Sequence, residues 1–233
     1  MSDMNVLNGA TIAFDLDGTL VESAPDLIAA VNAVLIAEDL NPLKYWATRP
    51  FISRGARWLL QSGIAANGLD EPTARAAALF DRFHCHYSAH IADESQPFPG
   101  VINALERIRM AGAKLVVCTN KPTELSRRLL TELGMVDFFD GIVGIDAVTA
   151  PKPDATHLIE AVRAVDGDLA YTIMVGDSGT DASTARAAGT PLILVDFGYT
   201  EIPAIELAPD VLLRHFDELV DACTTLLKQI RST

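Results

Sequence analysis

The sequence has few cysteines, few basic residues and no long apolar run. Cys85, Cys118 and Cys223 are widely spaced and include no Cys-x-x-Cys pair. This usage is typical of reduced cytosolic thiols rather than of a disulfide framework. No apolar run reaches the ~20 residues that a membrane span needs, and the first residues lack the basic start of a signal peptide. We therefore expect a cytoplasmic protein that does not associate with a membrane.

The shortage of basic residues limits the partners that the chain can bind. Lysine and arginine number 18 against 31 acidic residues, which leaves a formal net charge of -13. Nucleic acids and anionic membranes are held mainly by Lys and Arg, so neither is an expected partner. A small anionic substrate fits this charge only if a local cluster of bases or a metal ion overrides the surrounding field.

The chain does contain enough apolar residues for a packed core. It has 233 residues, 49% of them hydrophobic and 21% charged, which predicts one domain or one domain that carries an insert. From residue 97 onward, short Val/Ile/Leu runs alternate with helical segments, as in a Rossmann-like α/β fold whose parallel sheet is covered on both faces. We expect strands at 10–14, 114–118, 141–145, 171–175, 191–195 and 210–213, and helices at 101–111, 123–133, 156–165, 182–188 and 216–230.

The segment between the first two strands has a different pattern. Ser23 is suited to cap a helix, with Pro25 in its first turn and Asp26 three residues after the cap. Apolar residues then recur at helical spacing to about residue 91, and a helical block inserted after one strand predicts a small cap domain. We expect residues 22–96 to form this cap and residues 1–21 and 97–233 to form the catalytic core. The hinges are expected near 21–23 and 96–100.

Two carboxylates end the first strand. Asp15 and Asp17 follow the apolar run 10–14, and Gly18 predicts a turn that lets the two side chains diverge. Carboxylates at the end of a buried strand are costly unless they are paired or bind a cation. Because open α/β sheets bind their ligands at this edge, the pair indicates a functional site. An ordinary solvated loop is the alternative.

Three later strands are also followed by polar side chains, namely Thr119, Asn120, Lys121, Lys152, Asp177 and Asp181. Because the carboxyl ends of parallel strands share one edge, we expect these groups to meet the two aspartates of the first strand. The set suits phosphoryl transfer. One carboxylate attacks phosphorus, Mg²⁺ lies between the anions, and a lysine and small donors offset the charge. A second acid protonates the leaving oxygen.

The spacing of these groups resembles the four motifs of the haloacid dehalogenase superfamily. The matching residues are Asp15-x-Asp17-x-Thr19, Thr119, Lys152 and Gly176-Asp177-x-x-x-Asp181. The resemblance implies that Asp15 is the nucleophile and Asp17 the general acid/base. It also implies phosphoryl binding by Thr119, charge neutralisation by Lys152, substrate contacts from Thr19 and Asn120, and a Mg²⁺ site formed by Asp15, the backbone carbonyl of Asp17, Asp177 and, in support, Asp181.

Asp17 narrows the resemblance to phosphatases, because the dehalogenase members attack carbon and lack both the second aspartate and the metal. Segments 17–27, 118–122, 187–189 and 197–199 are similar to those of bacterial phosphoglycolate phosphatases, although Glu22 stands where that group usually has Asp. The resemblance implies a type-one cap and 2-phosphoglycolate as the substrate. The alternatives are a phosphatase for another sugar or metabolite phosphate, a phosphosugar mutase, and a binding protein without activity. Both monomer and dimer remain open.

A substrate with a carboxylate as well as a phosphate needs a second anion site. Arg54 and Gly55 precede an expected helix in the cap, and a helix start beside an arginine suits an anion. A surface arginine beside a helix cap is the alternative. Lys121 also has two interpretations, since it is either a contact for phosphate or a solvated lysine.

Overall fold

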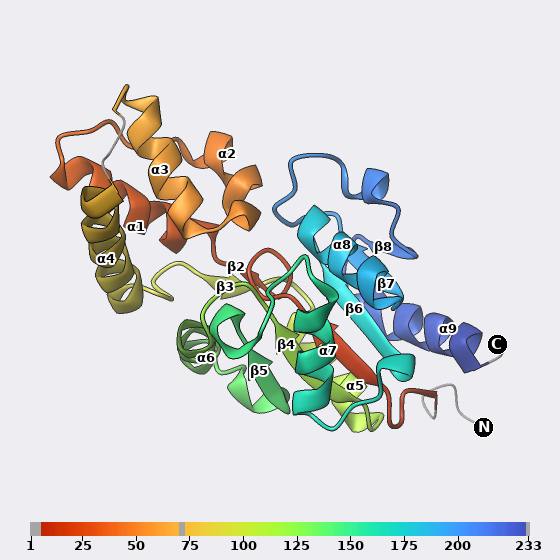
Figure 1. Cartoon of the computed structure of the whole chain (residues 1–233). Helices are drawn as coiled ribbons and strands as arrows, with labels where there is room; N and C mark the ends of the chain where they lie inside the picture. The colour runs from red at the N-terminus through yellow and green to blue at the C-terminus, as the bar shows by residue number, and fades with distance from the viewer. Residues whose placement is uncertain (1–5, 70–72, 232–233) are drawn as a thin grey trace.

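The computed structural model describes residues 6–69 and 73–231 (Figure 1). Its centre is a six-stranded sheet in the order β5-β4-β1-β6-β7-β8, and every neighbouring pair is parallel. The strands lie where the sequence predicts them, except that the third is shorter, because Ile145 begins a 3-10 turn. Their bounds are β1 Thr11–Phe14, β4 Lys114–Cys118, β5 Gly141–Val143, β6 Thr172–Gly176, β7 Leu192–Val195 and β8 Val211–Leu213.

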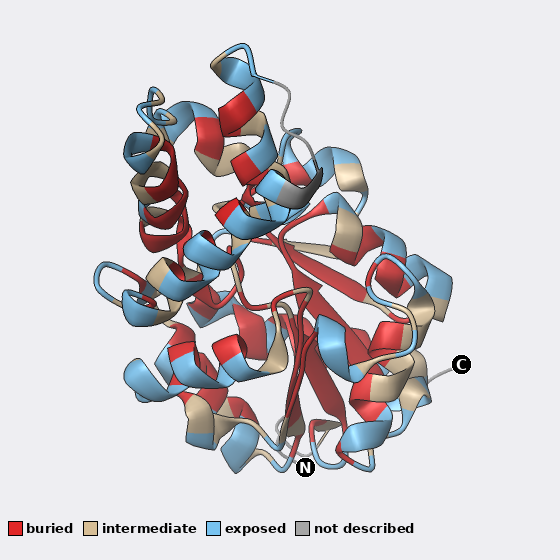
Figure 2. Ribbon diagram, turned by 60° about the vertical axis from the view of Figure 1, so that its left-hand side comes forward, coloured by how far each residue is buried: buried red, intermediate tan, exposed pale blue. Residues whose placement is uncertain are grey.

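Alternate residues of the strands pack on opposite faces of the sheet, as the pleat requires. Ile12 and Phe14 join an apolar cluster with α5 (Val101–Met110), α6 (Thr123–Glu132) and α9 (Leu219–Arg231). Ala13 joins a second cluster with α7 (Ala155–Ala164) and α8 (Gly179–Ala188). The strands are therefore covered on both faces, and Figure 2 shows them buried between helices with exposed outer faces. This confirms the predicted α/β class.

The strand order brings the functional loops together. Strand β1 lies between β4 and β6, with Phe14 opposite both Val117 and Val175. The chain leaves β1 toward β4 and β5 and later returns on its other side for β6, β7 and β8. The carboxyl ends at such a reversal of strand order form the crevice in which open α/β sheets bind ligands. The loops after β1, β4 and β6 meet there.

Among the described residues, four α-helices lie between β2 (Val21–Glu22) and β3 (Gln96–Pro97). We call residues 24–69 and 73–89 the helical segment, which stands to one side of the sheet (Figure 1). It contains α1 (Ala24–Ala37), α2 (Tyr45–Thr48), the 3-10 helix η2 (Arg49–Arg54), α3 (Ala56–Ala66) and α4 (Thr73–Ala89). Within the described ranges, no helix combines the length and apolar character needed to cross a membrane.

The two expected hinges lie side by side. β2 and β3 form an antiparallel pair with Val21 opposite Pro97 and Glu22 opposite Gln96. The sequence does not predict this pair, because strands of two residues carry no periodic signal. Both connections between the helical segment and the sheet therefore pass through one short ladder.

The prediction that the Ser23 side chain caps the helix is wrong. Ser23 occupies the N-cap position of α1 but makes no capping hydrogen bond, and its hydroxyl donates to Asp17 instead. Asp26 is buried and accepts from the backbone N–H groups of Glu94 and Ser95. The Ser23 hydroxyl is turned toward the Asp17 carboxylate in the neighbouring loop. Asp26 instead joins the start of α1 to the loop before β3.

Candidate active site

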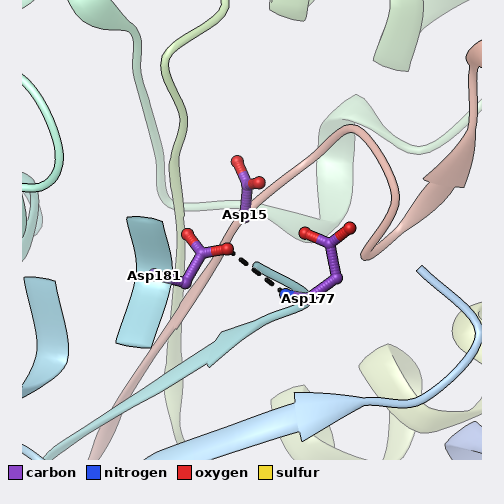
Figure 3. A group of neighbouring side chains, drawn as sticks. All are labelled: Asp15, Asp177 and Asp181. Atoms are coloured by element: carbon purple, nitrogen blue, oxygen red, sulfur yellow. Dashed lines mark hydrogen bonds between the residues drawn. The ribbon is translucent and has the colours of Figure 1, made fainter. Parts of the chain in front are cut away.

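Three carboxylates meet at the carboxyl edge of the sheet (Figure 3). Asp15 follows β1, Asp177 follows β6, and Asp181 lies in the first turn of α8. One oxygen from each lies within 4.8 Å of the others. Such a cluster of hard oxygen donors suits a divalent cation.

Lys152 supplies positive charge to this cluster. Its Nζ lies 3.0 Å from Asp15 Oδ1 and 2.6 Å from Asp181 Oδ1, and the lysine is only 4% exposed. Its backbone N–H donates to His157 Nδ1 at 3.2 Å, while His157 Nε2 lies 3.1 Å from the Val143 carbonyl. Burial lowers the pKa of His157, so the neutral ring accepts at one nitrogen and donates at the other. His157 therefore holds the loop that carries Lys152.

The pKa shifts indicate a site that lacks positive charge. Burial raises the pKa of Asp15 to about 6 even though Lys152 opposes the shift. Burial and the neighbouring Asp181 and Asp15 raise the pKa of Asp177 well above its usual value. Of these three carboxylates, Asp181 is the one with a lowered pKa, because Lys152 and Ser178 outweigh its burial. A divalent cation would relieve this repulsion, so the residues present fit Mg²⁺.

Asp181 is held more firmly than the other two carboxylates. It forms a capping box with Ser178 at the start of α8. Its oxygens accept hydrogen bonds from Lys152 Nζ, from the Ser178 hydroxyl and from the backbone N–H groups of Asp177 and Ser178. Its lone pairs are therefore largely used within the protein, which suits a supporting role better than direct binding of a metal.

A close approach of two loops fixes the position of Asp177. The Tyr199 backbone N–H donates to Asp177 Oδ2, and the Thr19 hydroxyl donates to Asp177 Oδ1 at 3.4 Å. Gly18 has a φ of +87°, and a Cβ there would collide with Asp177 Oδ2 and the Tyr199 ring. Only glycine makes this turn without strain, so the turn after β1 and the carboxylate after β6 are built to fit each other.

Asp17 does not join the carboxylate cluster, in agreement with the divergence expected from the turn at Gly18. Lys121 Nζ lies 3.0 and 3.2 Å from its two oxygens, and the Ser23 hydroxyl also donates to it. Lys121 is 7% exposed and donates to the Tyr87 hydroxyl at 2.6 Å. The interpretation of Lys121 as a solvated residue is therefore wrong.

Burial and neighbouring acidic groups act in opposite directions on the pKa of both Lys121 and Lys152, and at Lys121 one of those groups is a tyrosine. Burial alone would lower the pKa of Lys121, but Asp17 and then Tyr87 raise it well above its usual value. Burial raises the pKa of Tyr87 to about 12. The lysine is thus charged and the tyrosine neutral over the physiological range. Tyr87 belongs to α4, so this contact links the sheet edge to the helical segment.

The other residues predicted to contact the substrate, Thr19, Thr119 and Asn120, lie next to the carboxylates and lysines of the site. Thr119 is nearly buried, and its Oγ1 accepts from the Lys121 backbone N–H at 3.2 Å. Asn120 Nδ2 donates to the Lys152 carbonyl at 2.9 Å, and its buried Oδ1 has no protein partner among the described residues. Thr19 is fully buried against Asp177 rather than turned to open space. Direct contacts of these side chains with substrate stay predictions.

Arg54 and Gly55 lie farther out. Arg54 donates through Nε and Nη2 to the two carboxylate oxygens of Glu201, at 2.6 and 2.7 Å, on an exposed face. Gly55 is the N-cap residue of α3, with a φ of +87°. The expected helix start is therefore present, but the guanidinium already binds a carboxylate of the loop after β7. Anion binding by Arg54 and Gly55 stays a prediction.

Several residues at the site were not among the candidates predicted from the sequence. Tyr199 donates through its hydroxyl to Glu22 at 2.6 Å, and Arg49 Nε donates to Glu22 at 3.2 Å. Arg49 also donates to the carbonyls of Phe197 and Gly198. The longer acid at position 22 thus connects the hinge, the helical segment and the loop that holds Asp177. No local pattern marks Tyr87, Arg49 or His157, because their partners lie far away in sequence.

The fold and this site define a hydrolase family. A family model for haloacid dehalogenase-like hydrolases matches residues 10–189, and the chain belongs to that family. This confirms the resemblance drawn from the four motifs.

Similar proteins from three bacteria all carry the name phosphoglycolate phosphatase. A phosphoglycolate phosphatase of Caulobacter vibrioides is 51% identical over 227 residues, which cover 97% of this chain and 96% of that protein. A phosphoglycolate phosphatase of Agrobacterium fabrum is 40% identical over 209 residues, covering 90% of each chain. The crystal structure of a predicted phosphoglycolate phosphatase from Haemophilus somnus has a TM-score of 0.86 and 25% identity over 93% of this chain and 98% of its own.

Proposed function

We propose that the protein is a Mg²⁺-dependent phosphatase that converts 2-phosphoglycolate to glycolate and phosphate. The observation that carries the proposal is the buried set of Asp15, Asp177, Asp181 and Lys152 at one edge of the sheet, with Asp17 turned to a separate partner beside it. The relatives named phosphoglycolate phosphatase support the choice of substrate. A cytoplasmic location belongs to the same proposal.

The proposed reaction has two steps that balance. The Asp15 carboxylate attacks phosphorus, the bond from phosphorus to the ester oxygen breaks, and Asp17 gives its proton to the leaving oxygen. Asp17 then takes a proton from water, whose oxygen attacks phosphorus and releases Asp15 and inorganic phosphate. Lys152 remains beside Asp15 in both steps and offsets the negative charge.

Asp15, Asp177 and the Asp17 backbone carbonyl are the residues proposed to hold Mg²⁺, with Asp181 behind them. When bound, the ion offsets the repulsion between the phosphoryl oxygens and the carboxylates. Thr119 and Asn120 lie on the loop after β4 and are proposed to position the phosphoryl group.

We also propose that residues 22–96 form a cap over this edge. The two connections through β2 and β3 lie side by side, which suits a hinge, and Tyr87 of α4 already contacts Lys121. Closure of such a cap would exclude water from the aspartyl phosphate until the leaving group departs.

The test is phosphate release from a panel of phosphomonoesters, with Mg²⁺ and with a chelator. The panel contains 2-phosphoglycolate, several sugar phosphates and an aryl phosphate. We expect the highest kcat/KM with 2-phosphoglycolate and no release with chelator. Broad, metal-dependent release would keep the phosphatase and discard the substrate. No release from any ester would favour a mutase or a binding protein.

A further inference from the structure

Lys121 is a second buried lysine whose charge the proposed phosphoryl chemistry does not use. Its ammonium donates to both oxygens of Asp17 and to the Tyr87 hydroxyl, and it lies 4.6 Å from the centre of the Tyr87 ring. A buried ammonium is costly, so a lysine in this position calls for a specific reason.

The place of Lys121 is defined by the residue that it touches. A general acid must come within hydrogen-bond distance of the ester oxygen that it protonates. A single methylene separates that oxygen from the carboxylate of 2-phosphoglycolate. A cation in contact with Asp17 therefore lies within reach of the substrate carboxylate when Asp17 faces the ester oxygen.

The other basic side chains near this edge are committed elsewhere. Lys152 is paired with Asp15 and Asp181. Arg49 is paired with Glu22 and two backbone carbonyls. Arg54 is bound through two nitrogens to Glu201 on an exposed face. Among these four cations, Lys121 alone is both buried and in contact with the proposed general acid.

We propose, on the basis of the proposed phosphatase function, that Lys121 and Tyr87 form the subsite for the substrate carboxylate. An ammonium has three donors, so it can give up one bond to Asp17 and donate to the incoming carboxylate instead. The Tyr87 hydroxyl accepts in its bond with Lys121, which leaves its own O–H to donate to the second carboxylate oxygen.

This exchange links recognition to reactivity. Asp17 is held by Lys121 and Ser23, and a carboxylate at Lys121 loosens that hold. An ester without a carboxylate leaves both bonds in place and gains no assistance. Lys121 is therefore a specificity-determining residue, and its contribution appears in kcat as well as in KM.

The experiment compares two substrates of similar length, 2-phosphoglycolate and 2-hydroxyethyl phosphate, in the full-length enzyme with Mg²⁺. Lys121→Met is expected to lower the kcat/KM ratio of the two substrates roughly 10- to 100-fold, as for loss of a charge-assisted hydrogen bond. Lys121→Arg should restore part of the ratio, because it keeps the charge. Tyr87→Phe should lower the ratio by a smaller factor.

Arg54→Ala is the matched control, because it removes the other candidate for the carboxylate. An unchanged ratio in Lys121→Met, or the main loss of ratio in Arg54→Ala, would overturn the inference. Equal losses on the two substrates would show that Lys121 only positions Asp17. If Lys121→Met does not fold, as judged by circular dichroism, Lys121→Gln and competitive inhibition by glycolate give the same comparison.

The wild-type enzyme separates this inference from the function on which it rests. No preference for 2-phosphoglycolate in the wild type would discard the proposed substrate and the inference together. A preference that survives in Lys121→Met would discard only the inference.

Discussion

Two buried lysines lie at the same edge of the sheet, and they differ in what holds them. Lys152 contacts Asp15 and Asp181, which both belong to the sheet core. Lys121 contacts Asp17 and, through Tyr87, a helix of the helical segment. The first lysine is therefore fixed by the core alone, whereas the surroundings of the second depend on the position of the helical segment.

The difference suggests a division of function between the two lysines. Charge at the reacting phosphorus is needed for every ester, and the core provides it without the helical segment. The leaving group differs between esters. The part of the site that faces it is built from both the sheet core and the helical segment. If this division holds, changes near Lys152 affect all substrates alike, and changes near Lys121 depend on the substrate.

The largest expected effect is the loss of the nucleophile. Asp15→Asn should lower phosphate release from every ester by roughly four orders of magnitude or more, because the covalent step is lost. Thermal melting followed by circular dichroism should show a folded protein, and Asp81→Asn on the exposed face of α4 is the control. Retained turnover in purified Asp15→Asn would exclude covalent catalysis by this residue.

Removal of Lys152 should have the next largest effect. Lys152→Met should lower kcat by about 100- to 1,000-fold for phosphate esters with and without a carboxylate alike. Lys121→Met is the matched control, since it removes the same group from another buried site at this edge of the sheet. A loss with Lys152→Met that depends strongly on the ester would break the division between the two lysines.

Acidification should weaken binding of Mg²⁺. Burial raises the pKa of Asp15 to about 6, and it also raises the pKa of Asp177. A protonated carboxyl cannot bind the cation, so protons compete with the metal. We expect the Kd for Mg²⁺, measured by calorimetry, to rise by about tenfold for each pH unit below about 6. A Kd that is constant down to pH 5 would contradict a metal site at these carboxylates.

The smallest effect is expected at the seam between the helical segment and the loop after β7. Arg54→Ala removes an exposed ion pair with Glu201, and such pairs contribute little to stability. The melting temperature should change little, and 2-phosphoglycolate hydrolysis should fall more than aryl phosphate hydrolysis but less than in Lys121→Met. Equal losses on the two esters would exclude a role for Arg54 in binding the carboxylate.

Much of the core site could be predicted from the sequence. Asp15, Lys152, Asp177 and Asp181 each follow a strand of the parallel sheet, and the geometry of parallel strands places them at one edge. The divergence of Asp15 and Asp17 was also predictable, because Gly18 marks a turn between β1 and β2. These inferences succeeded because each depends on local pattern and on one rule of sheet topology.

The surroundings of Asp17 could not be predicted in the same way. Lys121 and Tyr87 are 34 positions apart, and nothing in either local sequence indicates that they touch. Ser23 matches the pattern of a helix cap, yet its hydroxyl donates to Asp17. In each case a side chain has several possible partners, and the choice depends on how the helical segment packs against the sheet.

The sequence by itself determined the α/β class, the inserted helical segment and the residues that meet at the strand ends. Periodicity is a local property, and the carboxyl ends of parallel strands share one edge of a sheet. Only the tertiary structure decided which acid each lysine contacts, how Glu22 joins Arg49 to Tyr199, and that Arg54 is paired with Glu201. Those contacts arise between segments far apart in the chain, and a buried charge binds whichever opposite charge the folded chain brings within reach.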